Sequence, residues 1–192
     1  GISFQRGRVQ GGVDYFHSKQ TNSIISVSGR PIRYVNLGEL TFNGAELEGK
    51  YYFRKNFFLE GSMLYQTNVD GNGRNDVTPI PNLGFKAGGS YEDRHGLSVS
   101  LFEVSDGTIN GYSNSVNPVQ GWHNILNGDL RYDLGKALHL SDRTGVSFVV
   151  HANNLTDFRV WLPSWGFTSV DEIPVEQGRV VYMGLRFSAG KS

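Results

Sequence analysis

The feature that most constrains this chain is a two-residue alternation of apolar and polar side chains, which recurs in nearly every segment between turn signals. Within residues 57–66, for example, Leu59 and Met63 fall on one face of an extended chain, whereas Glu60 and Ser62 fall on the other. Successive side chains of a β-strand point to opposite faces, so this period is typical of strands with one apolar face. The alternation therefore predicts an all-β protein.

Eight strands are predicted from the alternation and from the turn signals between them. They cover residues 8–28, 33–53, 57–68, 81–93, 96–104, 121–134, 144–155 and 178–187. In the fifth strand the alternation places Glu103 on the apolar face, and a β-bulge near Phe102 would restore the register.

The predicted connections alternate between short and long. Those at 54–56 and 94–95 are tight and the one at 135–143 is moderate, whereas those at 69–80, 105–121 and 156–177 are long. Among the connections that would lie on the rim with the long loops, only the one at 28–32 is short. Short turns on one rim and long loops on the other are typical of outer-membrane β-barrels, whose long loops face the outside.

Composition excludes several other classes of protein. The 192 residues carry 18 basic and 18 acidic side chains, so nucleic acid is not expected as a principal partner. Cysteine is absent, which excludes disulfides and thiolate metal sites. No run of about 18 apolar residues occurs, which excludes a transmembrane helix but leaves a transmembrane strand open.

A soluble β-sandwich would show the same alternation, because any half-buried antiparallel sheet does. Two observations favour a transmembrane barrel. The face opposite the apolar one is charged, as expected of a wet lumen, and aromatic residues stand at strand ends, where a girdle would meet the membrane interfaces. These aromatic residues are Tyr51, Phe53, Tyr91, Tyr132 and Phe187. Arginine should then be tolerated at the luminal positions Ser62, Gly88 and Asn127, and not at Leu59, Phe85, Leu130 or Phe148.

Three segments resemble the C-terminal barrel region of TonB-dependent outer-membrane receptors. They are YVNLGELTFNGAELEGKYYF at 34–53, NNLTDFRVW at 153–161 and QGRVVYMGLRF at 177–187. Each is short, but their order and spacing are specific, and the resemblance extends over essentially the whole chain. It implies an antiparallel up-and-down transmembrane β-barrel, of which these eight strands would be part of a set of 22.

The resemblance also implies parts that this sequence does not show. Receptors of the family have a plug domain, preceded by a short box that contacts TonB, and residues 1–5 look like the end of an earlier strand. The chain, 1–192, is therefore expected to be the C-terminal part of a receptor barrel that lacks its plug and earlier strands. A closed eight-stranded barrel is the rival.

The last strand is expected to close the barrel. By resemblance, its outward terminal aromatic residue would be presented to the barrel assembly machinery, and the alternate apolar residues before it would contact lipid. These residues are Val181, Met183, Leu185 and Phe187. The tail SAGKS at 188–192 departs from the family pattern, so lipid contact and barrel closure alone remain the alternative.

No motif predicts catalysis, a cofactor or a metal site, and the chain is not expected to be an enzyme. The five histidines lack i,i+2 or i,i+4 spacing. The segment DGNGRND at 70–76 has Arg74 and Asn75 where a calcium loop needs an oxygen ligand and Gly, which favours a solvated extracellular turn.

Ligand recognition is expected in the long loops, where aromatic, histidine and arginine side chains can stack on a ligand or bind its charges. The candidates are Tyr112, Trp122, His123, Arg159, Trp161, Trp165 and Phe167. Loop packing and interfacial anchoring are the alternative roles. The luminal charges are expected to pair across strands or to hold polar groups of a plug.

The first hypothesis is thus a segment of a bacterial outer-membrane receptor that imports a scarce ligand, such as an iron chelate, a cobalamin or a glycan. Its partners would be outer-membrane lipid, the assembly machinery, and TonB through the missing N-terminal part. An autonomous eight-stranded outer-membrane barrel with a structural or adhesive role is the alternative. A soluble β-sandwich binding module is the third possibility.

Overall fold

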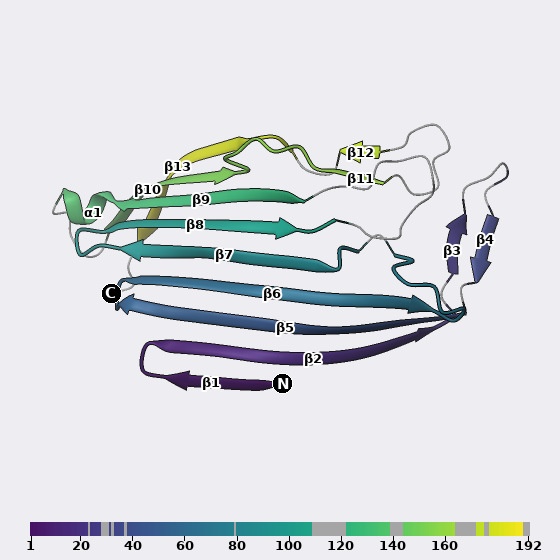
Figure 1. Ribbon diagram of the computed structural model, residues 1–192. Coiled ribbons are helices and arrows are strands. Elements are labelled where there is room, and N and C mark those ends of the chain that lie inside the picture. Colours follow the sequence, from purple (N-terminus) through teal and green to yellow (C-terminus); the bar gives the residue numbers. More distant parts are fainter. Residues whose placement is uncertain are drawn as a thin grey trace.

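The computed structural model describes residues 1–22, 24–27, 31, 33–36, 38–78, 80–108, 122–138, 144–163, 172–174 and 177–189. Within these ranges most of the chain forms one antiparallel sheet of nine strands (Figure 1). In spatial order they are β1 (Ile2–Arg6), β2 (Val9–Thr21), β5 (Glu39–Arg54), β6 (Phe57–Asp70), β7 (Leu83–Glu92), β8 (Leu97–Asp106), β9 (His123–Asp133), β10 (Thr144–Asn153) and β13 (Val180–Ala189). The predicted all-β antiparallel fold is confirmed.

The first two predicted strands are wrong in one respect, because neither is continuous. β2 ends before Asn22, which has a φ of 58°, and β5 begins after Gly38, which has a φ of 75°. Between them β3 (Ile24–Val27) and β4 (Arg33–Asn36) pair only with each other, at the end of the sheet where the other long loops lie (Figure 1). The segment 28–32 is therefore part of a long connection from β2 to β5.

The alternation of short and long connections is then regular. The connections between β1 and β2, β5 and β6, β7 and β8, and β9 and β10 lie at one end of the sheet, and the longer ones lie at the other (Figure 1). At the first end the Oδ1 atom of Asp93 accepts hydrogen bonds from the backbone N–H groups of His95 and Leu97, both at 2.8 Å. Gly96, with a φ of 94°, completes that turn.

The sequence did not predict α1 (Leu134–Ala137), which follows β9 directly. Asp133 caps it, because its Oδ1 atom accepts a hydrogen bond from the Lys136 backbone N–H at 3.1 Å. Among the described residues, no helix is long and apolar enough to cross a membrane.

The predicted bulge near Phe102 is also wrong. β8 keeps a continuous register with both neighbours, so that Glu103 lies opposite Ala87 on one side and Leu126 on the other. The Glu103 carboxylate stays on that face. The Ser105 hydroxyl, two residues further along β8 on the same face, donates a hydrogen bond to it at 3.1 Å. The sheet does have an irregularity, but it lies in β5, between Tyr52 and Arg54.

The sheet has an outer face and an inner face. On the outer face Leu47 of β5, Met63 of β6 and Phe85 of β7 lie side by side, and on the inner face Glu48, Ser62 and Lys86 of the same strands do so. Phe58 on β6 is also on the inner face. Neighbouring positions along each strand therefore belong to different faces, as the alternation predicts.

The apolar outer face is not buried against a second layer. Leu47 is 49% exposed and Met63 is 45% exposed, and the buried apolar residues of the described chain are Leu40, Ala152 and Val160. A water-soluble sheet covers its apolar face with another sheet or with helices. This one presents that face to its surroundings, which is stable only where those surroundings are apolar too.

Candidate functional site

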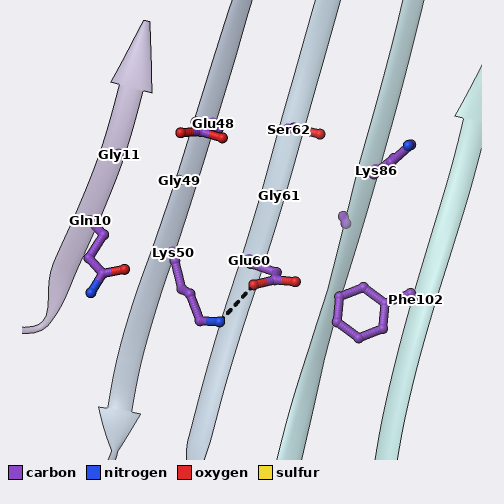
Figure 2. A pocket seen from close by; sticks show the side chains of 11 residues that line it. Gln10, Gly11, Glu48, Gly49, Lys50, Glu60, Gly61, Ser62, Lys86 and Phe102 are labelled. Carbon is purple, nitrogen blue, oxygen red and sulfur yellow. Dashed lines mark ion pairs between the residues drawn. The ribbon is translucent and has the colours of Figure 1, made fainter. Parts of the chain in front are cut away.

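The inner faces of β2, β5, β6, β7 and β8 form a concavity of ≈ 380 Å³. Figure 2 shows its lining, in which polar and charged side chains predominate. They are Gln10, Glu48, Lys50, Glu60, Ser62 and Lys86, and the apolar ring of Phe102 lines the concavity beside them. Because every second residue of each strand points to this side, charged side chains from neighbouring strands gather on the same surface.

Lys50 is held by two kinds of contact. Its Nζ atom lies 2.9 Å from the Oε2 atom of Glu60, its direct cross-strand partner. The same ammonium group lies 3.6 Å from the centre of the Phe58 ring and 5.4 Å from that of Tyr52. A carboxylate and two aromatic faces therefore fix the position of this cation. The predicted pairing of charges across strands is found here.

A second concavity, of ≈ 370 Å³, lies further along the inner face and is mainly acidic. Asp14 and Glu46 are direct cross-strand partners, and Glu48 lies two residues along from Glu46. Neither glutamate has a cation within ion-pair distance in the described part of the chain. Like charges placed opposite each other destabilise a sheet, so this surface favours a cationic partner.

On the far strands of the sheet, His151 and Asp129 form a close pair. The His151 Nδ1 atom lies 2.5 Å from Asp129 Oδ1, and the Tyr182 ring lies beside the imidazole with ring centres 6.4 Å apart. Within the described ranges, His, Asp and Glu side chains form no group of three that could hold a metal ion.

Two adjacent ligand candidates lie on different faces. The Trp122 ring centre lies 5.9 Å from that of Phe85 on the outer face, where the indole is 48% exposed. His123 points to the inner face, where it is buried and its Nε2 atom lies 3.4 Å from Asp106 Oδ2. Among the described residues its Nδ1 atom has no hydrogen-bond partner. The two side chains therefore cannot contact one ligand together.

Three of the other candidates lie outside the described residues, namely Tyr112, Trp165 and Phe167. Arg159 is exposed in the long connection after β10, and Trp161 begins β11 (Trp161–Pro163), which pairs with β12 (Glu172–Pro174). Phe158, which was not among the candidates, stacks on His123 with ring centres 6.5 Å apart. This contact brings the connection after β10 close to the start of β9.

The segment considered as a calcium loop is organised by its own groups. The Oδ1 atom of Asp70 accepts hydrogen bonds from the backbone N–H groups of Asn72 and Arg74, at 3.0 and 2.9 Å. Its Oδ2 atom accepts from Arg74 Nε at 2.7 Å and Nη2 at 2.6 Å. Both carboxylate oxygens are thus already engaged, which agrees with an ordinary turn.

β13 pairs with β10 in an unbroken antiparallel register from Thr144 opposite Ala189 to Asn153 opposite Val180. Its alternate apolar side chains lie on the outer face and are largely exposed, with Met183 at 71% and Phe187 at 70%. Val181 and Leu185 share this face, and Tyr182 lies on the other. The last strand of the sheet thus pairs along its whole length with β10.

A protein-family model described as "TonB dependent receptor-like, beta-barrel" matches residues 1–155. The chain belongs to this family. Curated proteins gave no match.

Three solved structures illustrate the likeness in fold. The copper transporter OprC has a TM-score of 0.73 at 15% identity, over 98% of this chain and 30% of its own. Pseudomonas aeruginosa FpvA with a heterologous pyoverdine has a TM-score of 0.69 at 17% identity, over 95% of this chain and 25% of its own. The ferric yersiniabactin uptake receptor FyuA from Yersinia pestis has a TM-score of 0.66 at 18% identity, over 96% of this chain and 28% of its own.

The chain therefore spans less than a third of the length of these receptors. At such identities the likeness shows the fold alone, and it agrees with the antiparallel meander described above. The assignment of the chain to TonB-dependent receptor barrels, predicted from three short segments, is confirmed by the family match.

One of those receptor-like segments, NNLTDFRVW, contains a clamp that sequence reasoning did not recognise. Asn154, 2% exposed and with a φ of 51°, donates from Nδ2 to the carbonyl oxygens of Phe158 and Gln177, at 2.7 and 3.0 Å. Its Oδ1 atom accepts from the Phe158 N–H at 2.9 Å. Asp157 Oδ1 accepts from the Arg179 N–H at 2.8 Å. The two side chains tie the end of β10 to the start of β13.

Proposed function

We propose that this chain is part of the barrel of an outer-membrane receptor, which imports a scarce ligand with energy supplied through TonB. The observation that carries the proposal is the exposed apolar outer face of a single-layer sheet opposite a charged inner face. Lipid outside and a polar lumen inside account for both. The family match supports the same conclusion.

The barrel would be larger than the described sheet. In that sheet β1 pairs only with β2 and β13 only with β10, so the nine strands do not close on themselves. We propose that further strands complete a barrel of 22, that the short turns face the periplasm, and that a plug domain occupies the lumen. The unpaired Glu46 and Glu48 would then hold cationic groups of the plug.

The ligand would be bound at the end with the long loops. His123, Arg159 and Trp161 are the proposed contacts within the described chain, with Tyr112, Trp165 and Phe167 completing the set. Trp122, beside Phe85 on the outer face, fits an interfacial anchor better. A metal ion or metal chelate is the preferred ligand class, because the similar structures include a copper transporter and receptors for ferric chelates.

The test is uptake by cells that carry or lack the full-length gene. Under depletion of iron, copper or cobalamin, or with a glycan as carbon source, loss of the gene should abolish growth on one ligand. The gene should restore it only in cells that have TonB. Normal uptake of every ligand without the gene, or restored uptake without TonB, would count against the proposal.

A further inference from the structure

The rim with the short turns is basic. Six cationic side chains lie at its turns and strand ends, and all are exposed: Arg6, Arg8, Arg54, Lys55, Arg94 and Lys136. They come from all four connections at this end of the sheet, whose turns lie along one edge in Figure 1. Successive hairpins are two strands apart, so their turns lie about 10 Å from one another, close to the Debye length at physiological salt.

These cations lack anionic partners in the described part of the chain. None lies within ion-pair distance of a carboxylate. Arg8 donates to the backbone oxygen of Phe53 at 3.0 Å, which orients it but does not neutralise it. The carboxylates of Asp93 and Asp133 are both engaged with backbone N–H groups of their own turns. The six cations outnumber the three carboxylates of the described part of this rim, Glu92, Asp93 and Asp133, so the rim keeps a net positive charge.

The opposite rim is arranged differently. There Lys19 Nζ lies 2.6 Å from Glu39 Oε1, and Arg74 Nη2 lies 2.6 Å from Asp70 Oδ2. Lys19 and Arg74 at the long-loop end are thus paired within the described chain, although Arg33, Arg159 and Arg179 at that end are not, whereas none of the six described cations at the short-turn end is paired. This difference is not a consequence of overall composition, because the chain has equal numbers of basic and acidic residues.

Apolar and aromatic side chains border the basic rim on the outer face. Tyr51 and Phe53 are each 41% exposed with ring centres 4.7 Å apart, and Phe53 stacks on Phe57 at 5.0 Å. Arg54 follows this cluster directly. Aromatic rings at the edge of an apolar band with cations immediately beyond it are the arrangement expected where acyl chains meet phosphate headgroups.

We propose that the basic rim binds anionic phospholipid headgroups of the leaflet on the short-turn side. This inference depends on the proposed function, because it requires the outer face to lie in a membrane. Each interfacial cation contributes about 1 kcal/mol of attraction to an anionic surface, which corresponds to roughly a fivefold preference. Several cations along one rim would therefore select anionic over zwitterionic lipid and fix the depth of the sheet at this interface.

The test compares two matched variants of the full-length receptor. The rim variant is Arg6→Gln, Arg54→Gln and Arg94→Gln, and the control removes the same charge at the other end through Lys19→Gln, Arg33→Gln and Arg179→Gln. Each protein is reconstituted in phosphatidylcholine containing about one-fifth phosphatidylglycerol. Native mass spectrometry then measures the ratio of the two lipids retained per receptor.

The wild type and the control should retain an excess of phosphatidylglycerol over phosphatidylcholine. In the rim variant the ratio of the two lipids should fall by a factor of about five or more. Arg6→Lys, Arg54→Lys and Arg94→Lys should preserve it, because the charge remains. Equal ratios in rim and control variants, from receptors that insert normally, would overturn the inference alone. A wild type that does not insert would instead overturn the proposed function.

Discussion

Lys50 and Glu60 face each other across β5 and β6, with 2.9 Å between Nζ and Oε2 and the Phe58 ring beside the ammonium group. The lysine side chain is 26% exposed and the carboxylate 40%, so water screens much of their attraction. A double-mutant cycle with Lys50→Met and Glu60→Gln should therefore give a coupling free energy of about 0.5–1 kcal/mol. Urea unfolding of the full-length receptor in detergent would measure it. A coupling above about 2 kcal/mol would show that the pair is desolvated.

Adjacent residues on β6 offer a direct test of the two faces. Met63→Arg places a cation on the outer face at mid-strand and should cost roughly 2–4 kcal/mol, whereas Ser62→Arg points into the lumen and should cost far less. Folding of the full-length receptor into lipid vesicles would give both values. Similar costs at the two positions would contradict a lipid-facing outer surface.

Two other luminal positions that the sequence predicts to tolerate Arg are unsuitable as controls for this test. A side chain at Gly88 would overlap the Phe102 ring, and the Oδ1 atom of Asn127 accepts a hydrogen bond from the Asn154 N–H at 3.0 Å. The alternation of faces is correct at both, but neither packing partner was visible in the sequence. Ser62 remains the appropriate control.

Asn154→Ala should destabilise the receptor by roughly 2–4 kcal/mol. The change removes several buried hydrogen bonds and places alanine at a positive φ. Asn153→Ala, at the exposed neighbouring position, should cost less than about 0.5 kcal/mol. Thermal and urea unfolding would compare the two, and an equal effect would show that the clamp has no energetic importance.

The loop after β6 should open in acid. The backbone N–H and side chain of Arg74, together with the Asn72 N–H, hold the pKa of Asp70 below its usual value. Stabilisation by this carboxylate is therefore complete above the unfolded pKa of about 3.9, and is lost as pH falls through the lower folded value. Pepsin cleavage near this loop should rise below about pH 4. Asp70→Asn should be cleaved more than the wild type at the upper end of the pH range in which pepsin is active, and the two should converge as the pH falls.

Phe187→Ala should lower the amount of assembled receptor and leave the ligand affinity of assembled molecules unchanged. Its side chain is 70% exposed on the outer face, so it contacts the surroundings of the barrel and not the lumen. Ser188 and Ala189 belong to β13 and pair with β10, so the whole tail is not dispensable, and only removal of residues 190–192 should leave assembly unchanged or improved. Surface-exposed receptor and ligand binding would be quantified separately, and normal assembly with lost binding would refute this role.

Local pattern predicts most of the fold, because strand faces depend on the two-residue period and the register depends on tight turns. It fails where side chains organise the backbone over several residues. Asn22 ends β2 early and Gly38 delays the start of β5, each through a positive φ value, and Asp133 caps a helix that alternation could not signal. The candidate site was less predictable still. Trp122 and His123 are adjacent in the predicted strand 121–134, so the alternation already places them on opposite faces, although both were chosen as ligand candidates. The contact of Phe158 with His123 joins separate connections, which no local pattern signals.

The tie between the end of β10 and the start of β13 also bears on how such receptors can diversify. Asn154 and Asp157 reach the backbone of Gln177 and Arg179 directly, so the intervening residues are not needed to set where the final strand begins. The stretch from 161 to 176, which begins after the buried Val160, can then be replaced as a unit. With the long loops facing the outside, as proposed, changes in its length or chemistry would alter the exposed surface without disturbing the sheet, which makes it a natural position for grafting a foreign epitope.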